Sequence, residues 1–257
     1  MKKHKYTIIS IVSIVVVLLI WQLCTETLGL VSTMIIPSPY IVIKAFIFKL
    51  TSPNPDTGTL LQHIWASLKV ALMGFCFGVV IGVPLGILMG WYKKFDLFVK
   101  PIFDLLRPIP PIAWIPLMIL WLGIGIQAKA VIIFFSAFVP CVINTYSGIK
   151  QTSPVHIWVA QTFGASNFTI LRKVAIPTAL PSIFTGMRVS LMLSWTSLVA
   201  AELLAATRGL GFMIQAARMM ARTDIIVVGM LTIGGVGAVL SYLLGLLEKK
   251  FVKGWVK

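Results

Sequence analysis

The sequence predicts an all-α, polytopic membrane protein with about six transmembrane helices. Of its 257 residues, 58% are apolar and only 11% are charged, whereas soluble domains have about 45–50% apolar and about 25% charged residues. Apolar stretches of about 20 residues recur along the chain, and each is long enough to cross roughly 30 Å of hydrocarbon as a helix. The predicted spans are residues 7–27, 64–91, 104–124, 128–149, 178–202 and 224–247.

The first apolar stretch follows a basic start and therefore looks like a signal peptide. It has no small-x-small cleavage site, and the bulky residues Trp21, Gln22 and Leu23 precede Cys24. We expect a retained first membrane helix.

The distribution of lysine and arginine orients the spans, because cytoplasmic loops carry an excess of these residues. With both termini in the cytoplasm, the internal set is the larger one: Lys2, Lys3, Lys5, Lys93, Lys94, Lys150, Arg172, Lys173, Lys249, Lys250, Lys253 and Lys257. The external set is Lys44, Lys49, Lys129, Arg208, Arg218 and Arg222.

Two longer connections fall on the external side. In residues 28–62, Pro37 and Pro39 start a short interfacial helix, and a loop follows Leu50. Residues 203–223 are apolar enough to lie along the membrane surface but too short to cross it again.

Sequence motifs for several other functions are missing. There is no phosphate-binding loop, no H-E-x-x-H and no G-x-S-x-G, and the histidines His4, His63 and His156 are scattered. The net charge of +15 lies in short clusters without interleaved aromatic residues, which argues against nucleic-acid binding. The chain is therefore expected to bind no metal or cofactor of its own and to be no enzyme.

The second span carries a glycine at every fourth position. Residues four apart share one helix face, so the series forms a smooth surface on which another helix can pack closely. This surface either slides during gating or is a static helix contact. The series is Gly74, Gly78, Gly82, Gly86 and Gly90.

The third span begins with a cluster of prolines, Pro108, Pro110, Pro111 and Pro116. Proline removes a backbone donor and disfavours helix before it. We expect an irregular start and a kink near Pro116, in backbone that either faces a cavity or forms a turn on the cytoplasmic side.

Polar residues inside the spans are candidates for the translocation pathway, since such residues are rare in membranes. Glu202 closes the fifth span, where it could instead lie in the headgroup region or pair with Arg208. Asn144 is either a pathway residue or an interhelical hydrogen-bond partner. The full candidate set is Asn144, Ser194, Trp195, Thr196 and Glu202.

The connection between the fourth and fifth spans predicts a helix, a turn and a second helix. The first helix covers 154–163, Gly164 and Ala165 allow a tight turn, and Ser166 or Asn167 caps a second helix.

The second helix is expected to run to Val174 and to be ended by Pro177. Arg172 and Lys173 within it could pair with a partner protein or with anionic lipid. The alternative to this helical element is an ordinary, positively charged cytoplasmic loop.

The stretch "VAQTFGASNFTILRKVAIPTALPSI" resembles the cytoplasmic EAA loop of type I ABC-importer permeases. Ala160, Gly164 and Pro177 match the third, glycine and proline positions of that pattern. The chain departs from it at Trp158, where the family usually has glutamate, and at Val159. The resemblance implies that the loop couples to an ATPase, with the coupling residues Trp158, Ala160, Gly164, Ala165, Arg172, Lys173 and Pro177.

Further blocks, among them "GVPLGILMG", "LLRPIPPIAWIPLMILWLGIG" and "SWTSLVAAELLAATRGLGFMI", resemble the nitrate/sulfonate/taurine branch of these permeases. The resemblance implies a homodimer in the inner membrane of a prokaryote, two cytoplasmic subunits that bind ATP and magnesium, and an external solute-binding protein. It also implies a permease core at 61–247, between an N-terminal part (1–60) and a basic cytoplasmic tail (248–257).

The expected cargo is an aliphatic sulfonate, taurine or a nitrate-like anion. The alternatives are a vitamin precursor of the thiamine-pyrimidine or riboflavin type, and an ion-coupled transporter or channel that works without an ATPase.

Overall fold

The computed structural model describes residues 2–204 and 206–252, and all regular secondary structure within them is helical. The chain divides into two compact units. Unit 1 comprises Met1–Ala66 and Thr207–Gly234, and unit 2 comprises Ser67–Ala206 and Gly235–Lys257.

Unit 1 holds the N-terminal helices and the segment between the fifth and sixth predicted spans. Its helix α2 begins at Pro39 because the Ser38 hydroxyl accepts a hydrogen bond from the Ile41 amide (3.3 Å) and proline suits the first helical position. The helices of unit 1 are α1 (Lys2–Gln22, continued by a π turn at Leu23–Thr27), α2 (Pro39–Thr51), the start of α3 (Leu60–Trp91), α10 (Leu210–Met219) and the start of α11 (Thr223–Val252).

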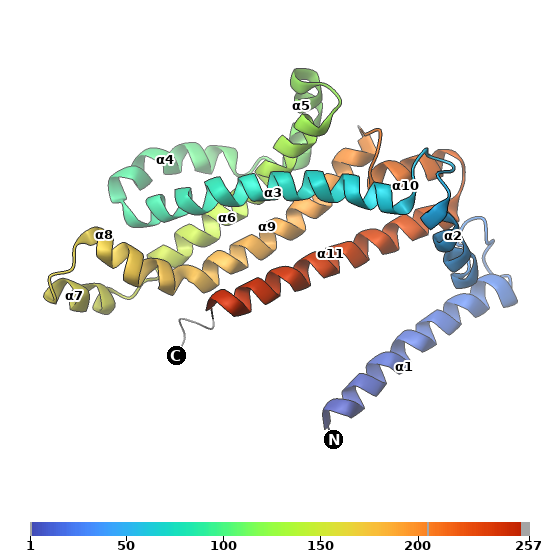
Figure 1. Ribbon diagram of the computed structural model, residues 1–257, viewed down its shortest axis with the longest axis horizontal. Coiled ribbons are helices and arrows are strands. Elements are labelled where there is room, and N and C mark those ends of the chain that lie inside the picture. The colour runs from blue at the N-terminus through green and yellow to red at the C-terminus, as the bar shows by residue number, and fades with distance from the viewer. Residues whose placement is uncertain (1, 205, 253–257) are drawn as a thin grey trace. The chain divides into compact units, whose positions relative to one another are not determined.

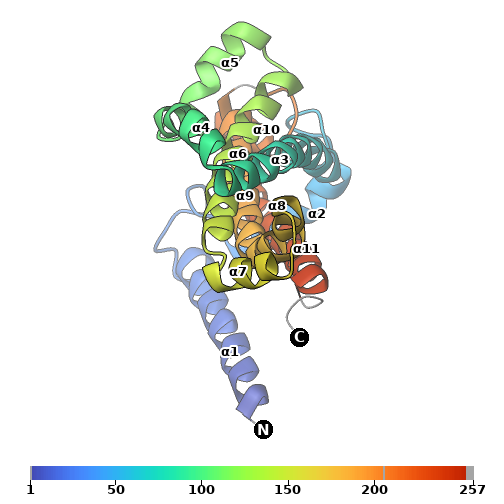
Figure 2. The same cartoon turned by 90° about the vertical axis from the view of Figure 1, so that its left-hand side faces the viewer.

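Unit 2 is built around the pair α6 and α9, which lie side by side with α7 and α8 at one end of the pair (Figures 1 and 2). Besides the remainder of α3 and α11, its helices are α4 (Lys93–Leu106), a 3-10 turn (Pro111–Trp114), α5 (Ile115–Leu122), α6 (Ile126–Lys150), α7 (Pro154–Thr162), α8 (Asn167–Ile170), a π turn (Leu171–Ala175) and α9 (Ile176–Leu204).

The contacts between helices fix their directions in unit 2. Gly74 of α3 lies against Ile133 of α6, and Gly90 lies against Ile149, so α3 and α6 run parallel. Gly148 of α6 lies against Ser182 of α9, whereas the earlier α6 residue Ile133 lies near the later α9 residue Ser194. Helix α9 therefore runs antiparallel to α6. The carboxyl ends of α3 and α6 therefore meet the start of α9 at one end of unit 2, here called the α7 end. The opposite end is the Glu202 end.

The glycine series of α3 lies against α6 along its whole length. A Cβ atom at Gly78 would lie 2.4 Å from the Cβ of Ala137, and one at Gly86 would lie 2.7 Å from the Cβ of Thr145. At Gly74, Gly82 and Gly90 the nearest α6 atom would be 2.6, 3.0 and 2.7 Å away. A side chain at any of these positions would force its neighbours to shift, so glycine is what lets the two helix backbones approach closely.

Helix α6 is packed on its other side by α9 in the same manner. A Cβ at Gly148 would lie 2.7 Å from the Cβ of Ser182, and one at Gly186 would lie 2.7 Å from the Cβ of Asn144. Small residues on both sides make α6 the central helix of unit 2.

Four helices among the described residues are long and apolar enough to cross a bilayer: Leu60–Trp91, Ile126–Lys150, Asn167–Leu204 and Thr223–Phe251. The bent pair Lys93–Leu106 and Pro111–Leu122 makes a fifth candidate, and Ile11–Thr27 is a shorter apolar helix. The all-α, polytopic fold is therefore confirmed. That residues 7–27 form a sixth span stays a prediction. Within the predicted basic tail, α11 continues to Val252, and residues 253–257 lie outside the described residues.

The predicted kink near Pro116 was wrong in its position. The segments Lys93–Leu106 and Pro111–Leu122 meet at 77°, and the bend lies in residues 107–110 between them. Pro116 lies in the first turn of α5, where its missing amide hydrogen removes no helical hydrogen bond. Residues 104–106 of the predicted third span thus belong to α4, which begins at Lys93, and the remainder follows the bend.

Pro177 does not end the second helix of the loop, contrary to the prediction. Residues Asn167–Leu204 form one continuous helix. The π turn at Leu171–Ala175 widens the helix just before the proline, and the Ile176 amide bonds to the Leu171 carbonyl five residues back. This wider turn accommodates the proline ring, which would collide with a carbonyl in a regular helix.

Candidate coupling and translocation site

The turn after α7 has the geometry of a Schellman motif. Gly164 adopts a left-handed conformation with φ of 73°, and its amide donates to the Gln161 carbonyl at 2.8 Å. The Ala165 amide donates to the Ala160 carbonyl at 3.0 Å. Glycine suits this position because a left-handed φ carries no Cβ penalty there. Ala160, Gly164 and Ala165 of the EAA-like stretch thus form the end of α7 and the turn that follows it.

The chain after this turn joins the core of unit 2 without a break. The Ser166 hydroxyl accepts a hydrogen bond from the Thr169 amide at 3.3 Å and caps α8, which continues into α9. Ile149, Leu171 and Ala175 pack together there against the partly buried Trp91. Arg172 and Lys173 are exposed, and Pro177 is half-buried in the first turn of α9.

Large apolar side chains lie exposed on α7 and α8. Val155, Val159 and Phe163 follow each other at intervals of four residues and so share one side of the helix. We call the five residues of this surface the α7 face: Val155 (56% exposed), Trp158 (63%), Val159 (51%), Phe163 (87%) and Phe168 (64%). Exposed large apolar side chains at these positions favour contact with another protein or a membrane. Beside it, the Cβ position of Gly164 meets no described atom within 4 Å, which leaves the backbone open to a partner.

The structure does not bring the candidate pathway residues together in one site. Ser194 is buried, and its hydroxyl lies 3.5 Å from the Ile133 carbonyl of α6. Trp195 is buried near Gly237 of α11, whereas Thr196 is exposed and bonds within its own helix. The Asn144 amide donates to the Pro140 carbonyl at 2.9 Å.

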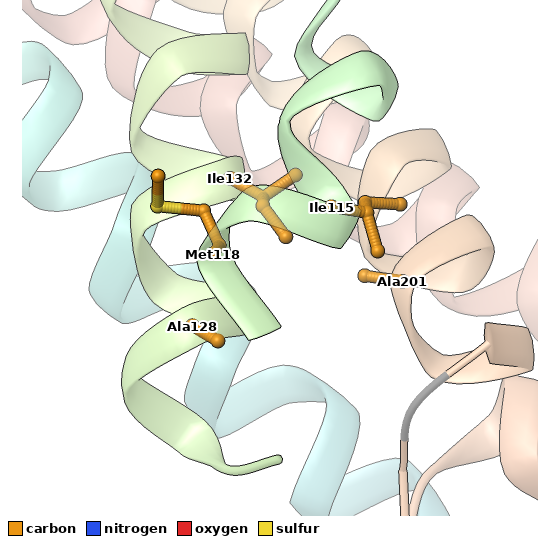
Figure 3. Packing of buried hydrophobic residues seen from close by; sticks show 5 residues of the cluster. All are labelled: Ile115, Met118, Ala128, Ile132 and Ala201. Carbon is orange, nitrogen blue, oxygen red and sulfur yellow. The ribbon is translucent and has the colours of Figure 1, made fainter. Parts of the chain in front are cut away.

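Glu202 is the one ionisable residue of that set, and only 1% of its surface is exposed. The Ser67 hydroxyl of α3 lies 2.8 and 2.9 Å from its two carboxylate oxygens, and Lys129 of α6 interacts with it electrostatically. Beside these residues, side chains from α5, α6 and α9 form an apolar cluster of Ile115, Met118, Ala128, Ile132 and Ala201 (Figure 3). Glu202 of α9 therefore interacts with α3 and α6 at this end of unit 2. Ser67 has no sequence signal that distinguishes it from other serines.

Unit 1 contains a buried charged cluster that the sequence analysis missed. The Lys49 ammonium pairs with Asp56 and donates to the carbonyls of Asn54 (3.1 Å) and Gly58 (2.6 Å). Nε2 of His63 lies 3.3 Å from Oδ2 of Asp56. Lys49, Asp56 and His63 are 0%, 4% and 0% exposed.

The cluster also reaches the segment before α10. The Gly209 amide donates to Nδ1 of His63 at 3.2 Å, and Phe212 lies with its ring 6.3 Å from the imidazole. Burial raises the pKa of Asp56, but hydrogen bonds and charge from His63 and Lys49 outweigh it, so this pKa lies below its usual value. Among the described residues, no group of three His, Cys, Asp or Glu side chains could hold a metal ion.

A comparison with protein families matches residues 82–255 to the binding-protein-dependent transport system inner membrane component. The chain belongs to this family.

Relatives of this inner membrane component match most of its length. The taurine transport system permease protein TauC of Escherichia coli (strain K12) is 39% identical over 93% of the chain and 85% of its own length. The nitrate import permease protein NrtB of a Synechocystis strain is 34% identical over 94% of the chain and 88% of its own length. The predicted resemblance to the nitrate/sulfonate/taurine branch is confirmed.

A solved structure shows the same fold. The MetNI methionine ABC transporter in inward-facing conformations matches with a TM-score of 0.61 and 22% identity, over 77% of this chain and 96% of that chain. The predicted fold of an ABC-importer permease is confirmed. This inner membrane component is thus a multi-pass transport protein.

Proposed function

We propose that two copies of this permease form the translocation pathway of an ATP-binding-cassette importer for small anions. Two ATP-binding subunits dock on the α7 face, and an external solute-binding protein delivers the cargo. ATP and magnesium bind in the docked subunits, since this sequence has no phosphate-binding loop.

The observation that carries the proposal is the exposed α7 face at a basic end of unit 2. Lys93, Lys94, Lys150, Arg172 and Lys173 all belong to this end. The excess of positive charge favours the cytoplasm for it. An apolar face in that compartment meets water, and a protein partner that covers it removes this unfavourable exposure.

The shape of the loop suits a moving contact. Helix Asn167–Leu204 runs from the α7 end into the core without interruption, so a displacement of α8 must move α9 as well. ATP binding shifts the pathway between two states only if the docked subunit binds α7 differently in each state.

The departure at Trp158 bears on the chemistry of docking. With tryptophan in place of glutamate, the α7 face contains five apolar residues and no acidic one. We therefore expect the docking to depend mainly on buried apolar area and to resist added salt, because salt screens exposed charge pairs but not apolar contacts.

The proposed cargo is an organic sulfonate of the taurine type or a nitrate-like anion, by analogy with the two relatives named above. Screening the solute-binding protein encoded beside this chain for ligand-induced thermal stabilisation tests the cargo. Stabilisation by taurine, other sulfonates or nitrate supports it, and stabilisation only by a vitamin precursor overturns it.

The docking is tested by Phe163→Asp, which places a carboxylate in the α7 face. The chain is co-purified with its ATP-binding subunit, and the recovered subunit ratio and ATP-driven uptake in liposomes are measured. Recovery of the ATP-binding subunit should fall at least about tenfold, the effect of a 1.4 kcal/mol loss.

The matched control is Gln161→Asp, which adds the same charge to an exposed position on another side of α7. It should leave the complex intact. A Phe163→Asp chain that retains its partner and its uptake would contradict the proposal. Uptake by the purified chain alone would instead favour an ion-coupled transporter.

The orientation and stoichiometry need separate measurements. A reporter inserted at Ala165 should be active only if it works in the cytoplasm, and periplasmic activity would reverse the topology. Native mass spectrometry of the membrane complex should show two copies of this chain.

A further inference from the structure

Helix α4 runs back along α6 from the α7 end. The Tyr146 hydroxyl of α6 donates to Asp96 of α4 at 3.1 Å, and the Lys150 ammonium at the end of α6 lies 3.6 Å from the same carboxylate. Further along α4, the ring of Phe103 lies 6.1 Å from that of Phe138. The two helices are therefore antiparallel, and α4 ends beside the middle of α6.

The bend that follows α4, residues 107–110, lies halfway along the spans of unit 2. Beyond it, the ring of Trp114 stacks on that of Phe135 at 5.2 Å. Phe138 is the central residue of Ile126–Lys150, so about 18 Å of helix lies on either side of it at 1.5 Å per residue. This length exceeds half of the roughly 30 Å hydrocarbon thickness. The bend is thus at the depth of the bilayer centre.

Regular helix cannot continue through the bend, because Pro108, Pro110 and Pro111 have no amide hydrogen. Leu106 instead accepts a hydrogen bond from the Ile109 amide at 3.1 Å. Irregular backbone at this depth is tolerated only where it is buried in protein or lines a water-filled cavity.

A cavity of about 250 Å³ opens at this bend, lined by side chains of α4, the bend itself, α6 and α9. Among the lining residues, Arg107 is the one that carries a charge. Trp114 and Phe138 are among its aromatic walls, and the hydroxyl of Ser136, another lining residue, donates to the Ile132 carbonyl at 3.0 Å. Drug-sized ligands occupy about 300–1,000 Å³, so the space suits a smaller molecule.

The charge of Arg107 is only partly compensated. Its Nη1 lies 3.2 Å from Oδ1 of Asp104, but the Lys100 ammonium lies 3.4 Å from Oδ2 of the same carboxylate. One carboxylate thus faces two cations, and one positive charge is in excess. The Arg107 side chain is 46% exposed.

Exposure to lipid is a poor explanation for an arginine at this depth. Near the end of a span, an arginine can extend to the headgroups, but from the centre about 15 Å of hydrocarbon would intervene. Charged side chains at the bilayer centre are costly and generally face a bundle interior or a water-filled cavity.

We propose that Arg107 binds the anionic group of the cargo halfway along the translocation pathway. The inference rests on the proposed function and names the side chain that the transported anion meets. A guanidinium presents a planar fork of N–H donors that matches oxyanions, which suits a sulfonate or a nitrate. Asp104 holds this fork in place when no cargo is present, and the aromatic walls contact the short organic part of a sulfonate.

Thiol modification tests this inference without an ATP-binding subunit. Ile109 lines the same cavity and is 40% exposed, so Ile109→Cys is made in the full chain in permeabilised membranes. Two reagents are compared, the anionic sulfonatoethyl methanethiosulfonate and the cationic trimethylammonioethyl methanethiosulfonate. Mass spectrometry of the peptide that contains residue 109 gives both rates. The anionic reagent carries an ethylsulfonate group, as taurine does.

Adding Arg107→Gln to Ile109→Cys should lower the ratio of the anionic to the cationic rate by at least about tenfold, since one charge at close range acts on the two reagents in opposite directions. Arg107→Lys keeps the charge and should retain most of the ratio, and Asp104→Asn should raise it. At constant ionic strength, taurine or nitrate should slow the anionic reagent in Ile109→Cys.

The matched control is Lys94→Gln, which removes the same charge from an exposed position on α4, about 20 Å along the helix from Arg107. It should leave the ratio unchanged. An equal fall in Lys94→Gln and Arg107→Gln would overturn the inference, because the effect would then come from overall charge.

Three further results would overturn it: an unchanged ratio in Arg107→Gln, no reaction of Ile109→Cys with either reagent, or no slowing by either taurine or nitrate. If Arg107→Gln does not fold, the opposite change expected for Asp104→Asn decides. None of these measurements requires ATP-driven uptake, so the proposed function and the role of Arg107 can fail separately.

Discussion

The α3–α6 interface and the Lys49 cluster both bring distant segments into close contact, by opposite means. Between α3 and α6 the contact depends on the absence of side chains, since a Cβ atom at any glycine of the series would lie within 3.0 Å of α6. In the cluster, three polar side chains fill the interior: Lys49 pairs with Asp56, His63 lies beside Asp56, and Lys49 and His63 bond to three backbone groups.

This difference determines what each contact tolerates. The glycine interface is sensitive to volume and insensitive to pH, because no charge takes part in it. The cluster is sensitive to charge, because removing one partner leaves the others buried without compensation. Substitutions in the two regions should therefore destabilise the protein for different reasons.

The largest effect is expected from Asp56→Ala. This change leaves the Lys49 ammonium buried without its counter-charge, which should lower the free energy of unfolding by about 3–5 kcal/mol. Thermal unfolding in detergent measures it. The double variant Lys49→Met with Asp56→Leu should recover part of the loss, though not all, because the Asn54 and Gly58 carbonyls lose their donor. If Asp56→Ala is as stable as the parent, then burial of the Lys49 ammonium does not depend on the Asp56 carboxylate.

Gly78→Ala should have the next largest effect. The added methyl group would lie 2.4 Å from the Cβ of Ala137, so α3 and α6 must separate at a cost of about 1–3 kcal/mol. The same unfolding assay, run at two pH values, should give an equal loss at both.

Gly234→Ala is the matched control for that substitution. Gly234 lies within α11, and its Cβ position meets no described atom within 4 Å. Alanine should therefore stabilise the helix, by up to about 1 kcal/mol. Equal effects at Gly78 and Gly234 would refute the assignment of the α3 glycines to a close interface.

The smallest effect is a pH dependence that only the cluster should show. The pKa of Asp56 is lowered on folding, so its stabilisation is present above the unfolded value of about 3.9 and is lost as the pH falls through the lower folded value. Below about pH 5, the melting temperature of the parent should fall more steeply than that of Asp56→Asn. Parallel curves would contradict the role assigned to this carboxylate.

Hydrophobic length and glycine spacing were sufficient to predict the membrane fold. Residues 64–91, 128–149 and 178–202 were predicted as spans, and the helices cover Leu60–Trp91, Ile126–Lys150 and Ile176–Leu204. The positions of bends and helix ends were harder to predict. A proline disrupts a helix only where its missing amide hydrogen removes a hydrogen bond or where its ring collides with a carbonyl. Pro116 lies in the first turn of α5, and Pro177 follows the π turn within a continuous helix.

The polar contacts could not be predicted from the sequence. Ser67 and Glu202 are 135 residues apart, and His63 and Gly209 are 146 apart. Neither pair has a local spacing that would reveal it. The end of α7 was more accessible, because Gly164 and its neighbours form a local motif within six residues. Whether Trp158 and its neighbours couple to an ATPase stays a prediction.

On the proposed docking of an ATP-binding subunit, the continuous helix Asn167–Leu204 would act as a lever. At 1.5 Å per residue, its 38 residues span about 57 Å. A tilt of about 5° with the far end fixed would displace α8 by about 5 Å, nearly one helical turn. Within this helix, the π turn at Leu171–Ala175 departs from the regular α-helical hydrogen-bond pattern, and Pro177 and Pro181 follow it, so we expect bending to concentrate near α7. If a docked subunit moves α8, the stiffness of this five-residue turn should determine how far α9 moves with it.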